Sequence, residues 1–257
     1  MPLDDEIQHS AGILAASKHA VAFTGAGIST PSGIPDFRTP RTGLWERCDP
    51  MQVASIQVFC RDPQVFYDWI RPLAEKTAQA QPNPAHLALA EMERAGVIKT
   101  VCTQNIDGLH HKAGSVHVLE LHGSMRQATC MRCGSNAPSG PLWAQVSEHA
   151  EIPHCHRCQG IMKPDIVLFG GDLPTDVLFE AQDEARNCDV MLVVGSSLEV
   201  YPAAELPLMA WRHGAQVIIV DRQPTEMDSQ ATVVVRDDVA IAVPKIAVRL
   251  KQLKRMA

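Results

Sequence analysis

Four of the eight cysteines occur in two C-x-x-C pairs, Cys130 with Cys133 and Cys155 with Cys158. Two such turns present four thiolates to one ion, and four thiolates complete the tetrahedral shell of a zinc site. A complete shell leaves no open position for a catalytic water, so we expect a structural zinc. The alternative, four unrelated cysteines, is disfavoured by the paired spacing.

His122 lies shortly before Cys130 and has three possible roles: zinc ligand, catalytic base, or ordinary histidine at a strand end. His154 and His156 flank the second cysteine pair and offer further nitrogen ligands. Because four thiolates already fill a tetrahedron, none of these histidines is needed as a ligand. We therefore expect His122 to belong to a different site.

A glycine turn, GAGIS (25–29), directly follows an apolar run, as a dinucleotide-binding turn does. Glycine lets the backbone approach a pyrophosphate, whose charge is met by backbone N–H groups. The full G-x-G-x-x-G is absent because Thr30 occupies its last position, and no acidic residue closes a second strand about 20 positions on. This disfavours a hydride-transferring dehydrogenase, and a lone G-x-G is more often only a turn.

Polar and small residues follow three other apolar runs. TQNIDGLH (103–110) supplies two amides and a carboxylate after VIKTVC, and GSS (195–197) follows DVMLVVG. Ligands bind at such strand ends in open parallel sheets, and Asp221 after AQVIIV is placed to accept from a ribose diol. For 103–110 the alternative is an Asx-rich turn that caps the next helix.

The elements that carry these turns alternate between short apolar runs and helical patterns. This alternation indicates an α/β protein with a Rossmann-like parallel sheet covered by helices on both faces. The pattern predicts strands at 20–23, 97–102, 117–121, 166–170, 189–195, 215–220 and 231–235. It predicts helices at 4–18, 51–80, 82–96, 107–113, 175–187, 203–213 and 238–253, with an ordered binding loop at 31–50.

Composition narrows the class further. The 257 residues fit one large core with a smaller insertion, and 46% hydrophobic with 20% charged residues is typical of a globular protein. A formal net charge of -6 gives no sign of nucleic-acid binding. No signal peptide and no apolar run of about 18 residues is present, so no membrane association is expected. The unpaired Cys48, Cys60, Cys102 and Cys188 fit a reducing cytoplasm better than a disulfide framework.

Six features in this order resemble the sirtuins, the NAD-dependent protein-lysine deacylases. Each alone is weak, whereas together they are specific and cover nearly the whole chain. They are GAGISTPSGIPDFR (25–38), TQNIDGLHHKAG (103–114), LELHGS (119–124), the two C-x-x-C pairs, KPDIVLFG (163–170) and VVGSSLEVYPA (193–203).

The resemblance implies that NAD is held by several loops. Phe37 would lie near the nicotinamide, Gln104 and Asn105 would hold its ribose, and Ile106 with Asp107 would meet the carboxamide. The full cofactor set is Gly25, Ala26, Gly27, Thr30, Phe37, Arg38, Gln104, Asn105, Ile106, Asp107, His122, Gly195, Ser196, Ser197, Asp221 and Val239, with the serines and Asp221 on the adenosine side.

The resemblance also implies the chemistry, with His122, Asn105 and Asp107 as catalytic residues. The acyl carbonyl oxygen attacks the ribose anomeric carbon and nicotinamide leaves; a base, His122, then activates a ribose hydroxyl that attacks the imidate. Imidazole suits this role because its ordinary pKa lies near neutral pH. A dry pocket protects the intermediate from water. The products are free lysine, nicotinamide and an O-acyl-ADP-ribose.

Acyl-lysine proteins or peptides are the implied partners. Val167, Phe169, Gly170 and Val200 would line the acyl-lysine tunnel and pair with the substrate backbone as an added strand. Members that remove acidic acyl groups carry Tyr-x-x-Arg in the tunnel. Here the third residue after the tyrosine of YDWIR (67–71) is isoleucine, and the arginine follows one place later. We therefore expect neutral acyl groups rather than succinyl.

Three departures from the family pattern stand out. FGG (169–171) replaces the frequent FGE, so a polar group near the substrate groove is missing. Lys163 stands where arginine is common, and Asp221 stands where asparagine is usual. A carboxylate at 221 still accepts from a ribose diol and repels a 2′-phosphate, so NAD is expected rather than NADP.

The expected organisation is one Rossmann-like NAD-binding domain, formed by 1–38, 77–125 and 160–257, with a smaller discontinuous module. Residues 39–76 supply a cofactor-binding loop and helical segment, and the polar stretch 126–159, which is short of helix signals, supplies the zinc ribbon. The active site is expected in the cleft between the two parts.

Three other functions compete with the deacylase. A mono-ADP-ribosyltransferase would use the same scaffold with another nucleophile. A non-catalytic NAD or ADP-ribose binder is disfavoured because the base and the Asn105/Asp107 pair are retained. A zinc hydrolase that uses His110, His111 and His117 is least favoured, since no H-x-x-x-H helix or ligating carboxylate accompanies them.

Overall fold

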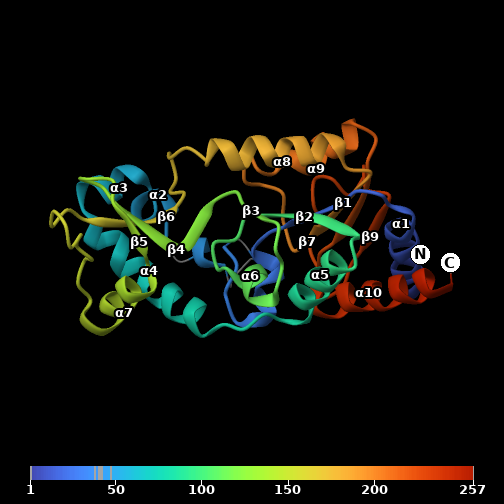
Figure 1. Cartoon of the computed structure of the whole chain (residues 1–257), viewed down its shortest axis with the longest axis horizontal. Helices are drawn as coiled ribbons and strands as arrows, with labels where there is room; N and C mark the ends of the chain where they lie inside the picture. Colours follow the sequence, from blue (N-terminus) through green and yellow to red (C-terminus); the bar gives the residue numbers. More distant parts are fainter. Residues whose placement is uncertain (1, 38, 40–42, 47, 257) are drawn as a thin grey trace.

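The computed structural model describes residues 2–37, 39, 43–46 and 48–256. The molecule is elongated (Figure 1), with a parallel sheet toward one end and a smaller antiparallel sheet toward the other. Within the described residues, no helix is long and apolar enough to cross a bilayer.

Six strands of the described chain form the parallel sheet, in the order β3-β2-β1-β7-β8-β9. Their bounds are β1 Ala20–Thr24, β2 Ile98–Thr103, β3 Val118–Glu120, β7 Val190–Val194, β8 Gln216–Val220 and β9 Val233–Val235. Six of the predicted strands are therefore confirmed. From β1 the chain proceeds to β2 on one side and later returns through β7 on the other, which makes the β1/β7 boundary a topological switch point.

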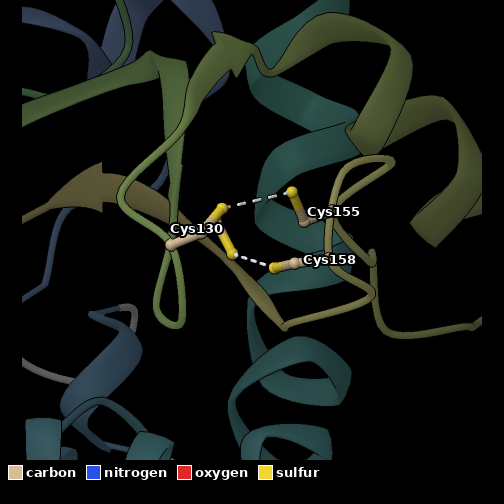
Figure 2. Close-up of side chains that lie close together, drawn as sticks. Cys130, Cys155 and Cys158 are labelled. Carbon is tan, nitrogen blue, oxygen red and sulfur yellow. Dashed lines mark hydrogen bonds between the residues drawn. The ribbon is translucent and has the colours of Figure 1, made fainter.

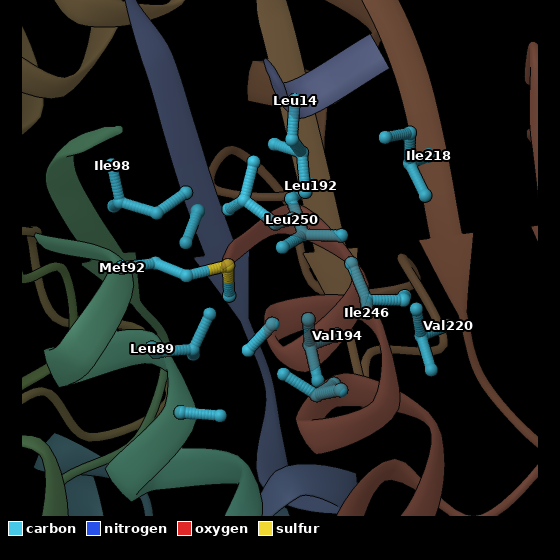
Figure 3. Close-up of a cluster of buried hydrophobic side chains, with 14 of the residues drawn as sticks. Leu14, Leu89, Met92, Ile98, Leu192, Val194, Ile218, Val220, Ile246 and Leu250 are labelled. Atoms are coloured by element: carbon cyan, nitrogen blue, oxygen red, sulfur yellow. The ribbon is translucent and has the colours of Figure 1, made fainter. Parts of the chain in front are cut away.

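Helices cover both faces of this sheet because successive strand side chains point to opposite sides. Ala20 and Ala22 of β1 belong to one apolar core, and Val21 and Phe23 belong to the other. Figure 3 shows the first core, packed between the sheet and its covering helices. That face carries α1 (Leu3–Ala16), α5 (Pro84–Arg94) and α10 (Val239–Met256); the other carries α8 (Thr175–Asn187) and α9 (Glu205–Arg212).

The start and end of α5 show how local chemistry sets an element. The Asn83 side chain accepts a hydrogen bond from the Ala85 N–H at 2.9 Å, and Pro84 occupies the first turn. Gly96 follows the helix with φ +72°, a left-handed conformation that glycine adopts without strain. The Asn83 amide also donates to the Ile28 carbonyl at 2.7 Å, which ties α5 to the glycine turn.

The smaller part of the molecule combines a second sheet with helices. Its antiparallel strands are β4 (Gly123–Cys130), β5 (Asn136–Pro138) and β6 (Met162–Ile166), in the order β5-β4-β6. Its helices are α2 (Pro50–Val53), α3 (Ile56–Arg61), α4 (Pro63–Gln79) and α7 (Gly140–His149). The short 3-10 turns η1 (Ala26–Ile28), η2 (Thr30–Ser32) and η3 (Leu44–Glu46) lie in the loop after β1, and α6 (Leu109–Ala113) follows β2.

Two sequence predictions in this region are wrong. The apolar run 166–170 is not a strand of the parallel sheet, because β6 ends at Ile166 and pairs with β4 in the second sheet. β6 buries alternate residues only, so it is a one-faced antiparallel strand. The stretch 126–159 also contains a helix, α7, where few helix signals were found.

Candidate functional site

Two neighbouring cavities lie beyond the carboxyl ends of β1, β2, β7 and β8. The first, of about 400 Å³, is lined by the loops after β1, β7 and β8 and by the start of α10. The second, of about 260 Å³, is lined by the loop after β2, by α4 and by the segment after β6. Ile34 and Pro35 line both cavities, so one stretch of the loop after β1 forms a shared wall.

The structure distributes the sequence-predicted residues between these cavities. Gly27, Thr30, Gly195, Asp221 and Val239 line the first. Ala26, Phe37, Gln104, Asn105, Ile106, Asp107, His122, Val167, Phe169, Gly170 and Val200 line the second. Gly25, Ser196 and Ser197 are not among the lining residues, and Arg38 lies outside the described residues.

The glycines of the turn at 25–29 let the loop after β1 pack closely against the loop after β7. The Gly27 N–H donates to the Gly195 carbonyl at 2.8 Å, and a Cβ on Gly25 would lie 2.8 Å from the Ser196 Cβ. Gly195 has φ +62°, and a Cβ there would collide with the Ile28 nitrogen. The loops after β1 and β7 therefore pack closely at the switch point because Gly25, Gly27 and Gly195 carry no side chains there.

His122 lies two residues after the end of β3 and lines the second cavity. Its Nδ1 is 2.9 Å from the Gln104 carbonyl oxygen, and because a carbonyl only accepts, Nδ1 carries the proton of the neutral ring. Nε2 is therefore the basic nitrogen, as a general base requires. The His122 carbonyl accepts from the Val167 N–H at 2.9 Å, so the residue is held between β3 and the segment after β6.

Asn105 and Asp107 are positioned by a serine that the sequence analysis did not single out. The Ser29 hydroxyl donates to Asp107 Oδ2 at 2.7 Å and accepts from the Asn105 amide at 3.1 Å. Burial raises the pKa of the Asp107 carboxyl above its usual value, although hydrogen bonds from the Leu109 N–H and Ser29 oppose this. Ser29 lies within GAGIS, but nothing local indicated that its hydroxyl would reach the loop after β2.

The Gln104 side chain links three parts of the site. Its amide oxygen accepts from the Ser196 hydroxyl at 2.9 Å, and its amide nitrogen donates to the Val200 carbonyl at 3.4 Å. Its backbone carbonyl fixes the His122 ring. The residue therefore joins His122 to the loop after β7.

Two buried histidines lie beneath this network. The His86 ring, on α5, is fully buried and lies 5.0 Å from the His110 ring, centroid to centroid. Burial lowers the pKa of His86 to about 4 and also holds the pKa of His110 well below its ordinary value. Their Nδ1 atoms have no hydrogen-bond partner among the described residues, so neither environment stabilises an added proton.

Acid is expected to destabilise the fold through His86. In the unfolded chain a histidine binds its proton near pH 6.5, whereas folded His86 binds it near pH 4. The unfolded state therefore holds more protons in this window, and stability falls as pH falls from about 6.5 to about 4, by about 3 kcal/mol in total. Urea unfolding at pH 7 and pH 4 measures the loss.

His86→Asn is expected to remove most of the His86 contribution to that pH dependence, whatever its effect on stability at pH 7. The matched control is His9→Asn, because His9 is exposed and lines neither cavity. An unchanged pH dependence in His86→Asn would contradict the assignment.

The second cavity has an aromatic and aliphatic wall. Trp45 stacks on Phe37 and on Trp69, with centroid distances of 5.1 and 5.4 Å, and meets the edge of Phe169 at 5.8 Å. No lysine or arginine is among the described residues that line this cavity. Trp45 and Trp69 were not predicted as site residues, since the contacts join the loop after β1 to α4.

The segment after β6 is tied to the junction of α2 and α3 by backbone hydrogen bonds. The Phe169 N–H donates to the Ala54 carbonyl at 2.9 Å, and the Phe169 carbonyl accepts from the Ile56 N–H at 3.0 Å. The backbone of Phe169 is therefore already paired. Gly170 and Val200 both line the cavity, and the pairing of a substrate strand with this region stays a prediction.

The four predicted cysteine ligands converge. All four sulfurs lie within 4.8 Å of one another, with 3.5 Å between those of Cys130 and Cys158 and 3.8 Å between those of Cys133 and Cys155. Tetrahedral Zn–S bonds of about 2.3 Å place sulfurs about 3.8 Å apart, so the thiols fit zinc. Figure 2 shows Cys130, Cys155 and Cys158 pointing toward one another, and backbone N–H groups following these three cysteines donate to their sulfurs.

The described residues hold no second cluster of metal-binding side chains. Within the described residues the four cysteines are the only such cluster, so His122, His154 and His156 lie outside it. His110, His111 and His117 do not converge: His110 contacts Thr24, whereas the other two contact glutamates. The zinc-hydrolase alternative is therefore not supported in the part of the chain that the structure covers.

The parallel sheet, the paired cavities at its switch point and the four-cysteine cluster define a nucleotide-binding enzyme fold with a zinc module. A sequence model of the Sir2 family matches residues 25–202, and the chain belongs to this family.

Known relatives match nearly the whole length. The chain is 49% identical over 256 residues to NAD-dependent protein deacylase 2 of Archaeoglobus fulgidus, covering 98% of this chain and 99% of that one. A structure of Sir2Af2 bound to a myristoylated histone peptide superposes with a TM-score of 0.85 at 44% identity, covering 99% of this chain and 100% of that one. A structure of a Sir2 homologue in complex with NAD superposes with a TM-score of 0.86 at 37% identity. The match covers 95% of this chain and 93% of that one.

Proposed function

We infer that the protein is an NAD-dependent protein-lysine deacylase that removes acetyl or other neutral acyl groups. Lysine, nicotinamide and an O-acyl-ADP-ribose are its products. One observation carries this conclusion: the basic nitrogen of His122 shares a cavity with Asn105 and Asp107, and this cavity adjoins the glycine-lined one. The names of relatives such as the Archaeoglobus deacylase support it.

In this assignment NAD spans both cavities. Its adenosine side would lie in the first, near Gly195 and Asp221, and its nicotinamide side in the second. Ile106 and Asp107 would meet the carboxamide, with Asn105 and Gln104 at the ribose. NAD supplies the ribose that accepts the acyl group, and the chain supplies orientation, exclusion of water and a base.

The acyl-lysine would enter past Gly170 and Val200 toward the aromatic wall of Trp45 and Trp69. A structure with a myristoylated histone peptide bound to Sir2Af2 supports an apolar acyl group as substrate. The zinc would be structural, held by the four cysteines. We also propose the domain boundaries given by the sequence and a cytoplasmic location, for which the absence of disulfides among the eight cysteines is the support.

The test is the reaction of NAD with an acetyl-lysine peptide, followed by mass spectrometry. The expected result is equimolar nicotinamide, deacetylated peptide and O-acetyl-ADP-ribose. A peptide that gains ADP-ribose would instead identify a mono-ADP-ribosyltransferase. Binding of NAD without nicotinamide release would identify a non-catalytic binder. Either outcome contradicts the deacylase.

Acyl selectivity is expected to favour neutral groups. Among the described residues, Ile70 rather than an arginine lines the second cavity, so this part of the chain offers a buried succinyl carboxylate no cationic partner. Tyr67 is not among the residues that line this cavity, and its hydroxyl donates to the Met162 carbonyl at 2.5 Å. We expect kcat/KM for butyryl-lysine to exceed that for succinyl-lysine by about 10²-fold. The two acyl groups differ only at their end, where succinyl has a carboxylate and butyryl has a methyl group. Faster turnover of succinyl-lysine would contradict the assignment.

The cofactor is expected to be NAD rather than NADP. Asp221 and Asp238 both line the first cavity, and Arg222 there is already paired with Asp238. A 2′-phosphate beside these carboxylates would be repelled, weakening NADP by about 10²-fold relative to NAD. Competition of each nucleotide against labelled ADP-ribose measures the ratio of the NAD affinity to the NADP affinity. Asp221→Asn should bring this ratio closer to one. Equal affinities in the wild type would contradict the prediction.

A further inference from the structure

The backbone of the glycine turn is already committed to internal hydrogen bonds. The N–H groups of Gly25, Gly27, Ile28 and Ser29 donate to the carbonyls of Val194, Gly195, Gly25 and Ala26, at 2.8–3.2 Å. Further along, the N–H groups of Ser32, Gly33 and Ile34 also donate to carbonyls within the loop. Four of the five N–H groups of the turn are therefore committed within the chain, so we expect side chains to meet part of the charge of a pyrophosphate.

The charged side chains of the first cavity are mostly acidic. Among the described residues its wall carries three carboxylates, Asp36, Asp221 and Asp238, and two cations, Lys76 and Arg222. Arg222 is paired with Asp238. The ammonium group of Lys76 has no hydrogen bond or ion pair within the described residues, which makes it the one uncommitted cation of that set.

Lys76 reaches this cavity from an element that carries none of its other lining residues. It lies in the last turn of α4, and Leu73, three residues earlier on the same helix, lines the second cavity. The other lining residues of the first cavity come from the loops after β1, β7 and β8 and from the region where α10 begins. Lys76 thus brings α4 to the border of the space that a dinucleotide would occupy.

We propose that Lys76 binds the diphosphate of NAD and closes the first cavity over it. The proposal rests on the assigned NAD-dependent function. A diphosphate carries two negative charges, and without Lys76 the described wall would offer it three carboxylates against one paired guanidinium. A lysine ammonium is a compact point charge suited to phosphate oxygens. Through this contact α4, which also borders the acyl-lysine cavity, would be drawn onto the bound nucleotide.

The test is titration calorimetry with ADP-ribose on wild type, Lys76→Gln and Lys76→Arg. Loss of one charge-assisted contact is expected to weaken binding by about tenfold in Lys76→Gln, with most of the affinity restored in Lys76→Arg. The salt dependence should be shallower in Lys76→Gln because one phosphate contact is missing. The matched control is Lys245→Gln, another exposed helical lysine, which lines neither cavity.

Kinetics separates this role from a general structural one. In Lys76→Gln the KM for NAD should rise, while kcat at saturating NAD and the KM for the acyl peptide stay near wild type. Affinity for ADP-ribose within twofold of the Lys245→Gln control would overturn the proposal. Failure of the deacylase assignment would appear differently, as an absence of nicotinamide release by the wild-type protein itself.

Discussion

Replacing His122 with alanine is expected to lower kcat for deacylation by about 10²–10⁴-fold and to leave the fold intact. The side chain faces the second cavity and makes its ring hydrogen bond to a backbone carbonyl, so its removal leaves no buried charge behind. In the assigned mechanism nicotinamide departs before the base acts. In a single turnover, His122→Ala should therefore still release nicotinamide. It should no longer form O-acyl-ADP-ribose.

The control for this variant is His213→Ala. His213 makes the same kind of contact, with Nδ1 2.8 Å from the Met209 carbonyl, but it lines neither cavity. Its removal should leave kcat near wild type. Near-normal O-acyl-ADP-ribose formation by His122→Ala would show that another group is the base.

Removing the zinc is expected to unfold the second sheet and to abolish activity. Structural zinc contributes folding free energy directly, and modules of this kind lose their structure without the ion. In this protein β4 begins at Gly123, the residue after the proposed base, and the His122 carbonyl is bonded to Val167 just beyond β6. Loss of the β4–β6 pairing would therefore release the base from its position.

Cys155→Ala is the sharpest form of this experiment. We expect zinc content to fall from one ion per chain to near zero, with fast hydrogen exchange in β4 and β6 and loss of deacylation. Cys188→Ala is the matched control, because Cys188 is also buried but lies outside the cysteine cluster. Full activity in zinc-free Cys155→Ala would contradict the coupling.

Features set by local chemistry could be predicted from the sequence. The ends of α5 follow from Asn83, Pro84 and Gly96, and six parallel strands follow from short apolar runs. The cysteine cluster also follows from local spacing, since each C-x-x-C turn presents two thiolates together. Where the physical cause lies within a few neighbouring residues, the sequence displays it.

Features set by contacts between distant segments could not be predicted. The run 166–170 is apolar, but it begins at the end of β6, which pairs with β4 in the antiparallel sheet. The run therefore does not join the parallel sheet. The glycine turn carries the pattern of a phosphate cradle, yet four of its five N–H groups donate to carbonyls that include those of Val194 and Gly195. Likewise the contact of Ser29 with Asp107 depends on how two loops meet at the end of the sheet.

Because Ile34 and Pro35 line both cavities, a change in one binding site reaches the other through this stretch of the loop after β1. A displacement of this wall that favours the nucleotide also changes the space beside the acyl-lysine. By linkage, any factor by which the peptide tightens NAD must equal the factor by which NAD tightens the peptide. A single coupling free energy therefore describes both substrates, and substitutions in the loop after β1 are where we expect it to change.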